Sequence, residues 1–244
     1  MKSVGKEIEK SLFKVKNPEK AAHLQKFFKT GRGEYGEGDM FLGINVPVTR
    51  AIIKNFKDKS SISDVKDLIN SQWHEIRLAG FLLLVEIYKK YVREKKVEDA
   101  KACVDFYLDN LISGNNWDLV DLVAPYLLGD WLVSHYDDRK ILYELSDNKR
   151  NLWEQRVAIV STLPLIKNRE FDETFHIAIK YFNHPHDLIH KATGWMLREV
   201  GKKGGYERLK NFLNQYGPIM PRTMLRYSIE KFEPEIRHHY LNLK

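Results

Sequence analysis

The residues best suited to chemistry begin with Trp117 and Asp121, which stand four positions apart in NNWDLVDLVAPYLLGDWLV, residues 115–133. Positions four apart share one face of a helix, so an indole ring and a carboxylate would lie side by side. A carboxylate placed there can stabilise a developing positive charge. The structural alternative is that Trp117 belongs to the core and that Asp121 is an ordinary solvated or paired carboxylate. Asp118 is a second candidate carboxylate in this segment.

Two later segments supply residues of complementary type. LWEQRVAIV contains Arg156, and KATGWMLRE contains Lys191, Trp195 and Arg198. Equal intervals of 39 residues separate Trp117, Arg156 and Trp195. Arginine binds phosphate and indole rings pack on sugars, so these side chains around one carboxylate suit a phosphodiester backbone. The pattern favours a nucleic acid as partner.

The elements that must position these residues have the periodicity of helices. Apolar residues recur at helical spacing along the chain, and neither alternating strands nor Asn-Gly or Asp-Gly hairpin turns are found. We therefore predict an all-α fold. Residues 115–133 are expected to form one helix, kinked at Pro125 and capped by Asn115 or Asn116.

Four predicted helices can be aligned on one leucine each: Leu84, Leu128, Leu163 and Leu197. Their intervals of 44, 35 and 34 residues are typical of two-helix repeats of the HEAT and armadillo type. Stacked helix pairs form an α-α superhelix whose equivalent helices line a concave groove. We predict one HEAT-like domain over residues 1–244, with N-terminal helices and a glycine-rich loop in 1–45 and the repeat array in 46–244.

The composition is ordinary for a folded protein, modestly favours a polyanionic partner and fits a reducing compartment. The 40 Lys and Arg residues against 33 Asp and Glu residues give a formal net charge of +7. The single cysteine, Cys103, excludes an intramolecular disulfide and a cysteine metal cage. The N-terminus is too charged for a signal peptide and no apolar run approaches membrane length, so we expect a cytoplasmic protein without membrane contact.

Two further patterns resemble ligand sites but lack the partners that such sites need. Residues 31–36 match G-x-G-x-x-G, yet a helical pattern precedes them and nearby acidic side chains would repel phosphate. We interpret residues 31–39, GRGEYGEGD, as a glycine-rich loop. Three histidines between residues 184 and 190 have neither a cysteine nor a clear fourth ligand near them, so we expect no metal.

The chain resembles the bacterial AlkD-type DNA glycosylases, the HEAT-like DNA alkylation repair family. The matching segments are EYGEGDMFLGINVP, NNWDLVDLVAPYLLGDWL, LWEQRVAIV and HKATGWMLREV, and the resemblance covers about residues 15 to 230. It implies that Asp121 is the catalytic carboxylate. It also implies that Trp117 and Trp195 pack against the deoxyribose and backbone at the lesion, while Arg156 and Arg198 contact the backbone.

The resemblance further implies a monomeric, cofactor-free enzyme that excises N3- and N7-alkylated purines from duplex DNA without base flipping, in base excision repair. Where the family pattern can place a tyrosine at the groove, this chain has KFFK, so Phe27 is the candidate contact and a hydroxyl is lost. Lys191 is a further candidate DNA contact. The alternative is a non-catalytic helical-repeat DNA-binding or scaffold protein, which would have little use for a carboxylate at position 121.

Overall fold

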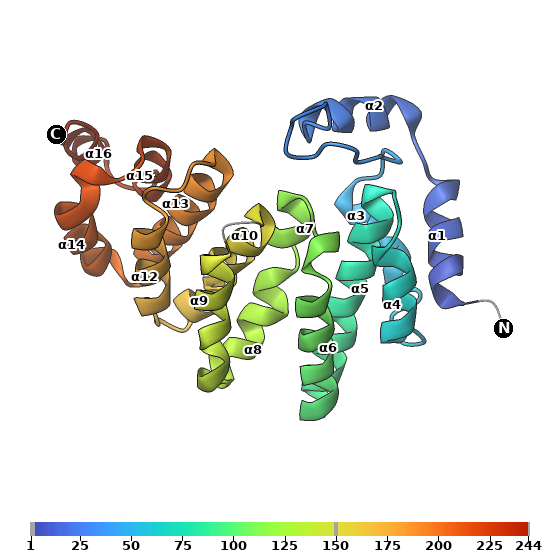
Figure 1. Ribbon diagram of the computed structural model, residues 1–244. Helices are drawn as coiled ribbons and strands as arrows, with labels where there is room; N and C mark the ends of the chain where they lie inside the picture. The colour runs from blue at the N-terminus through green and yellow to red at the C-terminus, as the bar shows by residue number, and fades with distance from the viewer. Residues whose placement is uncertain (1–2, 149–150, 244) are drawn as a thin grey trace. The chain divides into compact units, whose positions relative to one another are not determined.

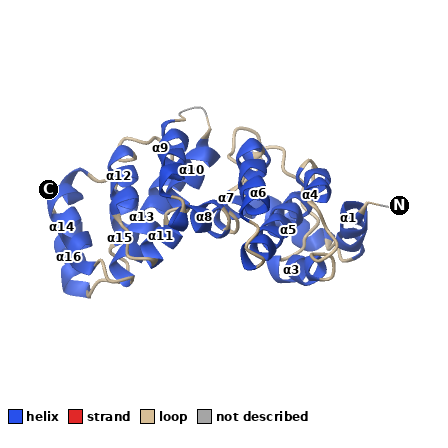
Figure 2. Cartoon of the chain, turned by 90° about the horizontal axis from the view of Figure 1, so that it is seen from below, coloured by secondary structure: helices blue, strands red, loops and turns tan. Residues whose placement is uncertain are grey.

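The computed structural model describes residues 3–148 and 151–243, which consist of helices joined by loops (Figures 1 and 2). These two ranges contain no strand, although an isolated bridge pairs Met40 with Trp73. The predicted all-α fold is therefore confirmed. None of the described helices is long and apolar enough to cross a membrane.

The chain divides into two compact units, Met1–Val123 and Ala124–Lys244. The first unit contains, in order, α1 (Val4–Lys14), α2 (Pro18–Phe27), α3 (Val46–Lys54), α4 (Ile62–Ile69), α5 (His74–Arg93), α6 (Val97–Asp109), the 3-10 turn η1 (Leu111–Ser113) and α7 (Trp117–Asp121). Helix α5 is central, because α1, α3, α4, α6 and α7 all pack against it. From His74 to Tyr88 every residue except Glu86 is buried, as expected of a helix that is apolar all round.

The N-termini of α2 and α3 show how the sequence sets helix boundaries. Asn17 caps α2 by accepting a hydrogen bond from the Lys20 backbone N–H at 3.0 Å, and proline occupies the first helical position. Asn45 caps α3 in the same way, with the Val48 N–H at 3.2 Å. Both caps satisfy backbone donors that the first turn leaves unpaired.

The segment 115–133 differs from the prediction of one kinked helix. It forms α7, the 3-10 turn η2 (Ala124–Tyr126) and α8 (Leu128–Ser134). Pro125 cannot donate a backbone hydrogen bond and its ring crowds the preceding turn, so the helix is interrupted rather than bent. The Asn116 side chain accepts from the Trp117 N–H at 2.9 Å, as one of the two predicted caps. The apolar positions stay buried as predicted: Leu119, Val123 and Leu127.

The second unit continues from η2 and α8 with η3 (Tyr136–Arg139), α9 (Lys140–Asp147), α10 (Leu152–Val160), α11 (Leu163–Lys167), α12 (Asp172–Lys180), α13 (Asp187–Lys202), α14 (Tyr206–Tyr216), η4 (Gly217–Ile219), α15 (Arg222–Ser228) and α16 (Pro234–Leu241). Helix α13 is central here, packing against α10, α11, α12, α14 and α15. Gly194 permits its close approach to α15, because a Cβ there would lie 2.5 Å from the Met224 carbonyl oxygen.

The residues used to align the repeat are buried, although Leu128 and Leu163 begin their helices whereas Leu84 and Leu197 lie within theirs. The four leucines are buried: Leu84, Leu128, Leu163 and Leu197. So are the alanines near them: Ala79, Ala124, Ala158 and Ala192. This burial agrees with a recurring inward face. The HEAT-like repeat and the single domain over residues 1–244 stay predictions.

Candidate functional site

Trp117 and Phe27 come together in the first unit, and Asp121 stands one helical turn after Trp117 on the same helix. Trp117 and Asp121 are the first and last residues of α7, and both are partly exposed. The Trp117 indole stacks on the Phe28 ring at a centroid distance of 5.1 Å and an interplanar angle of 24°. Phe27, whose side chain is 56% exposed, meets the indole edge-on at 6.0 Å. An aromatic surface therefore adjoins the α7 carboxylate, and Trp117 is not a fully buried core residue.

Asp121 lies close enough to the core of the first unit to influence it electrostatically. Burial raises the pKa of the α6 residue Tyr107, and the charge of Asp121 raises this pKa further. Asp121 itself is only partly accessible to water. A carboxylate held partly out of water acts more strongly on a nearby positive charge than one in bulk solvent.

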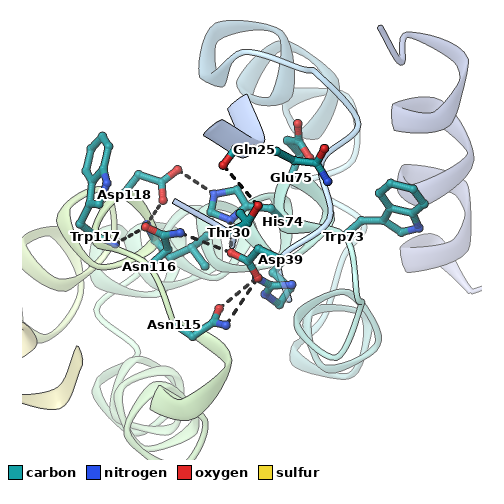
Figure 3. A network of polar contacts seen from close by, with 12 residues as sticks. Gln25, Thr30, Asp39, Trp73, His74, Glu75, Asn115, Asn116, Trp117 and Asp118 are labelled. Atoms are coloured by element: carbon teal, nitrogen blue, oxygen red, sulfur yellow. Dashed lines mark hydrogen bonds and ion pairs between the residues drawn. The ribbon is translucent and has the colours of Figure 1, made fainter. Parts of the chain in front are cut away.

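A buried polar cluster connects the N-terminus of α7 to α5 and to the glycine-rich loop (Figure 3). His74 lies at its centre, with Nδ1 3.0 Å from Asp39 Oδ2 and Nε2 2.8 Å from Asp118 Oδ2. Arg77 donates to the Asp39 carboxylate and to Asn115 Oδ1, the latter at 2.9 Å. The cluster thus joins residues from three separate segments of the first unit.

Burial and charge pairing set the protonation of this cluster. His74 is 1% exposed. Burial lowers its pKa, but hydrogen bonds and charges from Asp118 and Asp39 outweigh that effect and raise the pKa to about 9. Burial also raises the pKa of Asp39, whereas the His74 hydrogen bond and the Arg77 charge bring it below the ordinary value. Two cations and two carboxylates therefore balance in the interior.

Sequence reasoning did not identify this cluster. Its carboxylates lie 35 and 44 positions from His74 along the chain, so no local spacing connects them. The available signal was a histidine at the first position of α5, a helix otherwise rich in apolar residues. Asp118, the second candidate carboxylate of the sequence, is buried and its Oδ2 lies 2.8 Å from His74 Nε2.

The next residue of α5, Glu75, fixes the chain that follows the glycine-rich loop. Its carboxylate accepts three backbone hydrogen bonds, from Leu42 at 2.8 Å, Gly43 at 2.8 Å and Ile44 at 3.0 Å. Glu75 is 1% exposed, and these donors replace the water that it gives up. The segment from Asp39 to Ile44 is therefore held by adjacent residues of one helix.

The glycine-rich loop uses its own acidic side chains as hydrogen-bond acceptors. The Gly31 N–H donates to Glu34 Oε2 at 2.9 Å, and the Gly33 N–H donates to Glu37 Oε2 at 2.8 Å. Helix α2 precedes the loop, and glutamates occupy two backbone donors that a phosphate site would present. These observations support its interpretation as a structural loop.

Three of the predicted site residues lie on α13 in the second unit. Lys191, Trp195 and Arg198 follow one another at intervals of four and three residues and so share a helix face. Lys191 pairs with Asp187 at 2.8 Å, and its side chain is 42% exposed. Arg198 pairs with Glu230 on the loop after α15. Trp195 is partly exposed.

Arg156 occupies an interior position on α10. It is 5% exposed, and one guanidinium nitrogen donates to the Leu188 carbonyl oxygen at 2.6 Å. This hydrogen bond connects α10 to the first turn of α13. That all the predicted residues of both units face one groove stays a prediction.

The two histidines before α13, His184 and His186, form hydrogen bonds within the second unit. His184 Nε2 lies 2.8 Å from Gln155 Oε1, and the His186 N–H donates to His184 Nδ1 at 3.0 Å. His186 Nδ1 in turn accepts from the Leu188 N–H and caps α13. Burial is the main factor that lowers the pKa of His184 and of His186. Within the described part of the chain, no group of three or more His, Cys, Asp or Glu side chains could hold a metal ion.

Comparison with known proteins adds a family and a fold. A family model described as DNA alkylation repair enzyme matches residues 8–232. A solved structure described as "Predicted DNA alkylation repair enzyme from Enterococcus faecalis" is similar, with a TM-score of 0.69 and 20% sequence identity over 90% of this chain and 97% of that chain. At that identity the structural likeness concerns the fold alone. No curated protein matches this sequence.

Proposed function

The chain belongs to the family of DNA alkylation repair enzymes, and from that premise we propose that it is a DNA glycosylase acting on N3- and N7-alkylated purines in duplex DNA. Family membership gives it a role in DNA repair with DNA as its substrate. Our proposal adds that the enzyme cleaves the N-glycosidic bond and that its lesions are N3- and N7-alkylated purines. The observation that carries the proposal is the pairing of a partly exposed indole with a partly buried carboxylate one turn apart on α7.

Excision of an alkylated purine requires few catalytic groups beyond the Trp117 indole and the Asp121 carboxylate. Alkylation at N3 or N7 gives the base a positive charge, so the base can leave without protonation by a general acid. The sugar then develops oxocarbenium character, which a nearby anion stabilises. In our proposal Asp121 supplies that anion and orients the attacking water, which gives a proton to the carboxylate as its oxygen bonds to C1′. The Trp117 face adds a cation–π contribution beside the sugar.

The remaining predicted residues fit a role in holding the DNA backbone. We assign Trp195 to packing against the sugars, and Lys191 and Arg198 to phosphates, because they share one face of α13. Arg156 is buried, so its contribution would come from its charge and from support of α13. We assign Phe27 to an apolar contact beside Trp117. We propose that the base is not flipped, because every contact assigned here is to sugar or phosphate and none is to the base.

The test is Asp121→Asn, with Asp109→Asn as a matched control. Asparagine keeps the shape of Asp121 but removes its charge, so single-turnover release of N7-methylguanine should fall by roughly two orders of magnitude. Duplex affinity should survive or increase, because a negative charge near phosphates has been removed. Asp109 is an exposed carboxylate at the end of α6, in the same unit, and its substitution should leave excision unchanged.

Excision by Asp121→Asn at the wild-type rate would refute this assignment. If the wild-type protein binds duplex DNA but releases no alkylated base, the non-catalytic DNA-binding alternative takes the place of the proposal.

A further inference from the structure

We propose that His74, as a buried imidazolium, is a positioning residue that holds α7 in the orientation at which Trp117 and Asp121 act on DNA. The role rests on the proposed glycosylase function, but its structural part can be measured without any activity assay. His74 is 1% exposed, so it acts through α7 and does not touch the substrate.

The geometry of the cluster requires both ring nitrogens of His74 to donate. Each nitrogen lies within 3.0 Å of a carboxylate oxygen, one on Asp39 and one on Asp118. An ionised carboxylate only accepts hydrogen bonds, and a neutral imidazole has a single N–H. Only the imidazolium satisfies both contacts. Loss of its proton would turn a ring lone pair toward one carboxylate.

Helix α7 depends on such contacts because it is short. It has five residues, from Trp117 to Asp121, whereas isolated helices much shorter than about 12 residues are unstable in water. Asp118 in its first turn accepts from His74 on the central helix α5. The contact of Asp118 with His74 therefore adds a directed polar anchor to the apolar packing of Leu119 and Val120, and it helps to set the orientation of Trp117 and Asp121.

A stack of rings provides a second connection between His74 and the candidate site. The Phe28 ring lies 5.1 Å from the His74 ring and 5.1 Å from the Trp117 indole. Phe41 stacks on His74 at 4.5 Å. A displacement of the imidazole would thus reach Trp117 both through the Asp118 hydrogen bond and through Phe28.

The charged groups of the His74 cluster come from three segments of the first unit, with Asp39 and Asp118 paired to His74 itself and Arg77 paired to Asp39. Asp39 comes from the glycine-rich loop, Asp118 from α7, and Arg77 from the next turn of α5. With His74 protonated, these four charges sum to zero. Deprotonation of His74 leaves one net negative charge in the interior, and this charge destabilises the arrangement in which Asp39 and Asp118 both contact His74. Alkaline pH should therefore loosen the first turn of α7.

The first measurement concerns the wild-type protein and needs no variant. In ¹⁵N NMR spectra at pH 7, both His74 ring nitrogens should have the chemical shifts of a protonated imidazolium. The indole N–H signal of Trp117, which the variant Trp117→Phe identifies by its absence, should move as the pH rises through about 9. A neutral His74 tautomer at pH 7, or a Trp117 signal that does not change between pH 7 and 10, would overturn the proposal.

The second measurement compares His74→Gln with the control His176→Gln, the same change at an exposed histidine on α12. Single-turnover excision of N7-methylguanine by His74→Gln should be slower on the order of 10- to 100-fold, with duplex affinity little changed, because misplaced catalytic groups lower the rate constant rather than binding. The wild-type rate, corrected for spontaneous base loss, should fall above pH 9, and a folded His74→Gln should lack that fall.

The outcomes separate this proposal from the glycosylase proposal. A wild-type protein that releases no base refutes the glycosylase function, and the NMR experiment still decides whether His74 fixes α7. An active wild type with equal rates in His74→Gln and His176→Gln refutes the positioning role alone. If His74→Gln does not fold, the wild-type pH profile and NMR spectra decide.

Discussion

Raising the pH should selectively remove the stability that His74 gives to the first unit. Its pKa is raised from 6.5 to about 9 in the folded protein. A group whose pKa is higher in the folded state stabilises that state fully below the unfolded pKa, and this stabilisation disappears as the pH rises through the folded pKa. At 1.36 kcal/mol per unit, the shift corresponds to about 3 kcal/mol, present at pH 6 and lost by pH 10. Because His74 is 1% exposed, solvent screens it little.

The assay is urea unfolding of the wild type and of His74→Gln between pH 6 and 10. Glutamine has no titrating side chain, so the wild-type advantage in free energy of unfolding should shrink by about 3 kcal/mol over this range, with its steepest decline between the unfolded pKa of 6.5 and the folded pKa of about 9. The control His176→Gln makes the same change at an exposed histidine, so only a pH dependence beyond that of the control is assigned to His74. A wild-type advantage that stays constant from pH 6 to 10 would show that His74 carries no shifted charge and would refute the reasoning.

Two further predictions concern the loop and the DNA. Gly43 has a φ of +82°, and a Cβ there would lie 2.0 Å from the Asn17 carbonyl oxygen, so Gly43→Ala should lower the free energy of unfolding by at least about 2 kcal/mol. Gly33 has a φ of +79°, but no atom lies within 4 Å of a Cβ built there, so Gly33→Ala should cost only the backbone strain, about 1 kcal/mol. Urea unfolding measures both variants. Equal losses of unfolding free energy in Gly43→Ala and Gly33→Ala would contradict the steric cost assigned to Gly43. The logarithm of the affinity for undamaged duplex DNA should fall linearly with the logarithm of the salt concentration, because phosphate contacts release counterions. An affinity that does not vary with salt would exclude the proposed contacts between basic side chains and the DNA phosphates.

The helices could be predicted from sequence because their signals are local. Asn17 with Pro18, and Asn45 with Pro47, begin helices in the structure as such pairs predict. The apolar stretch after Trp73 forms the central helix of the first unit. Apolar periodicity, caps and prolines operate within a few residues of each other and can therefore be read without a structure.

The cluster that fixes the candidate site could not be predicted, because its bonds are long-range. Nothing near Asp39 or Asp118 indicates that both accept hydrogen bonds from His74. Arg156 shows the same limit: its regular spacing from Trp117 and Trp195 gives no sign that it is buried and bonded to a backbone carbonyl, and its contact with DNA stays a prediction. Sequence spacing identified a helix position correctly but could not give its accessibility.

The central claim is that Asp121 assists the departure of bases that already carry a positive charge. Its most direct test is a side-by-side excision assay on defined duplexes that contain N3-methyladenine, N7-methylguanine, uracil or hypoxanthine. The account predicts release of the two charged bases and little or no release of the two neutral ones, since no general acid takes part in the proposed mechanism. Efficient release of uracil or hypoxanthine would require a proton donor and would contradict the single-carboxylate mechanism.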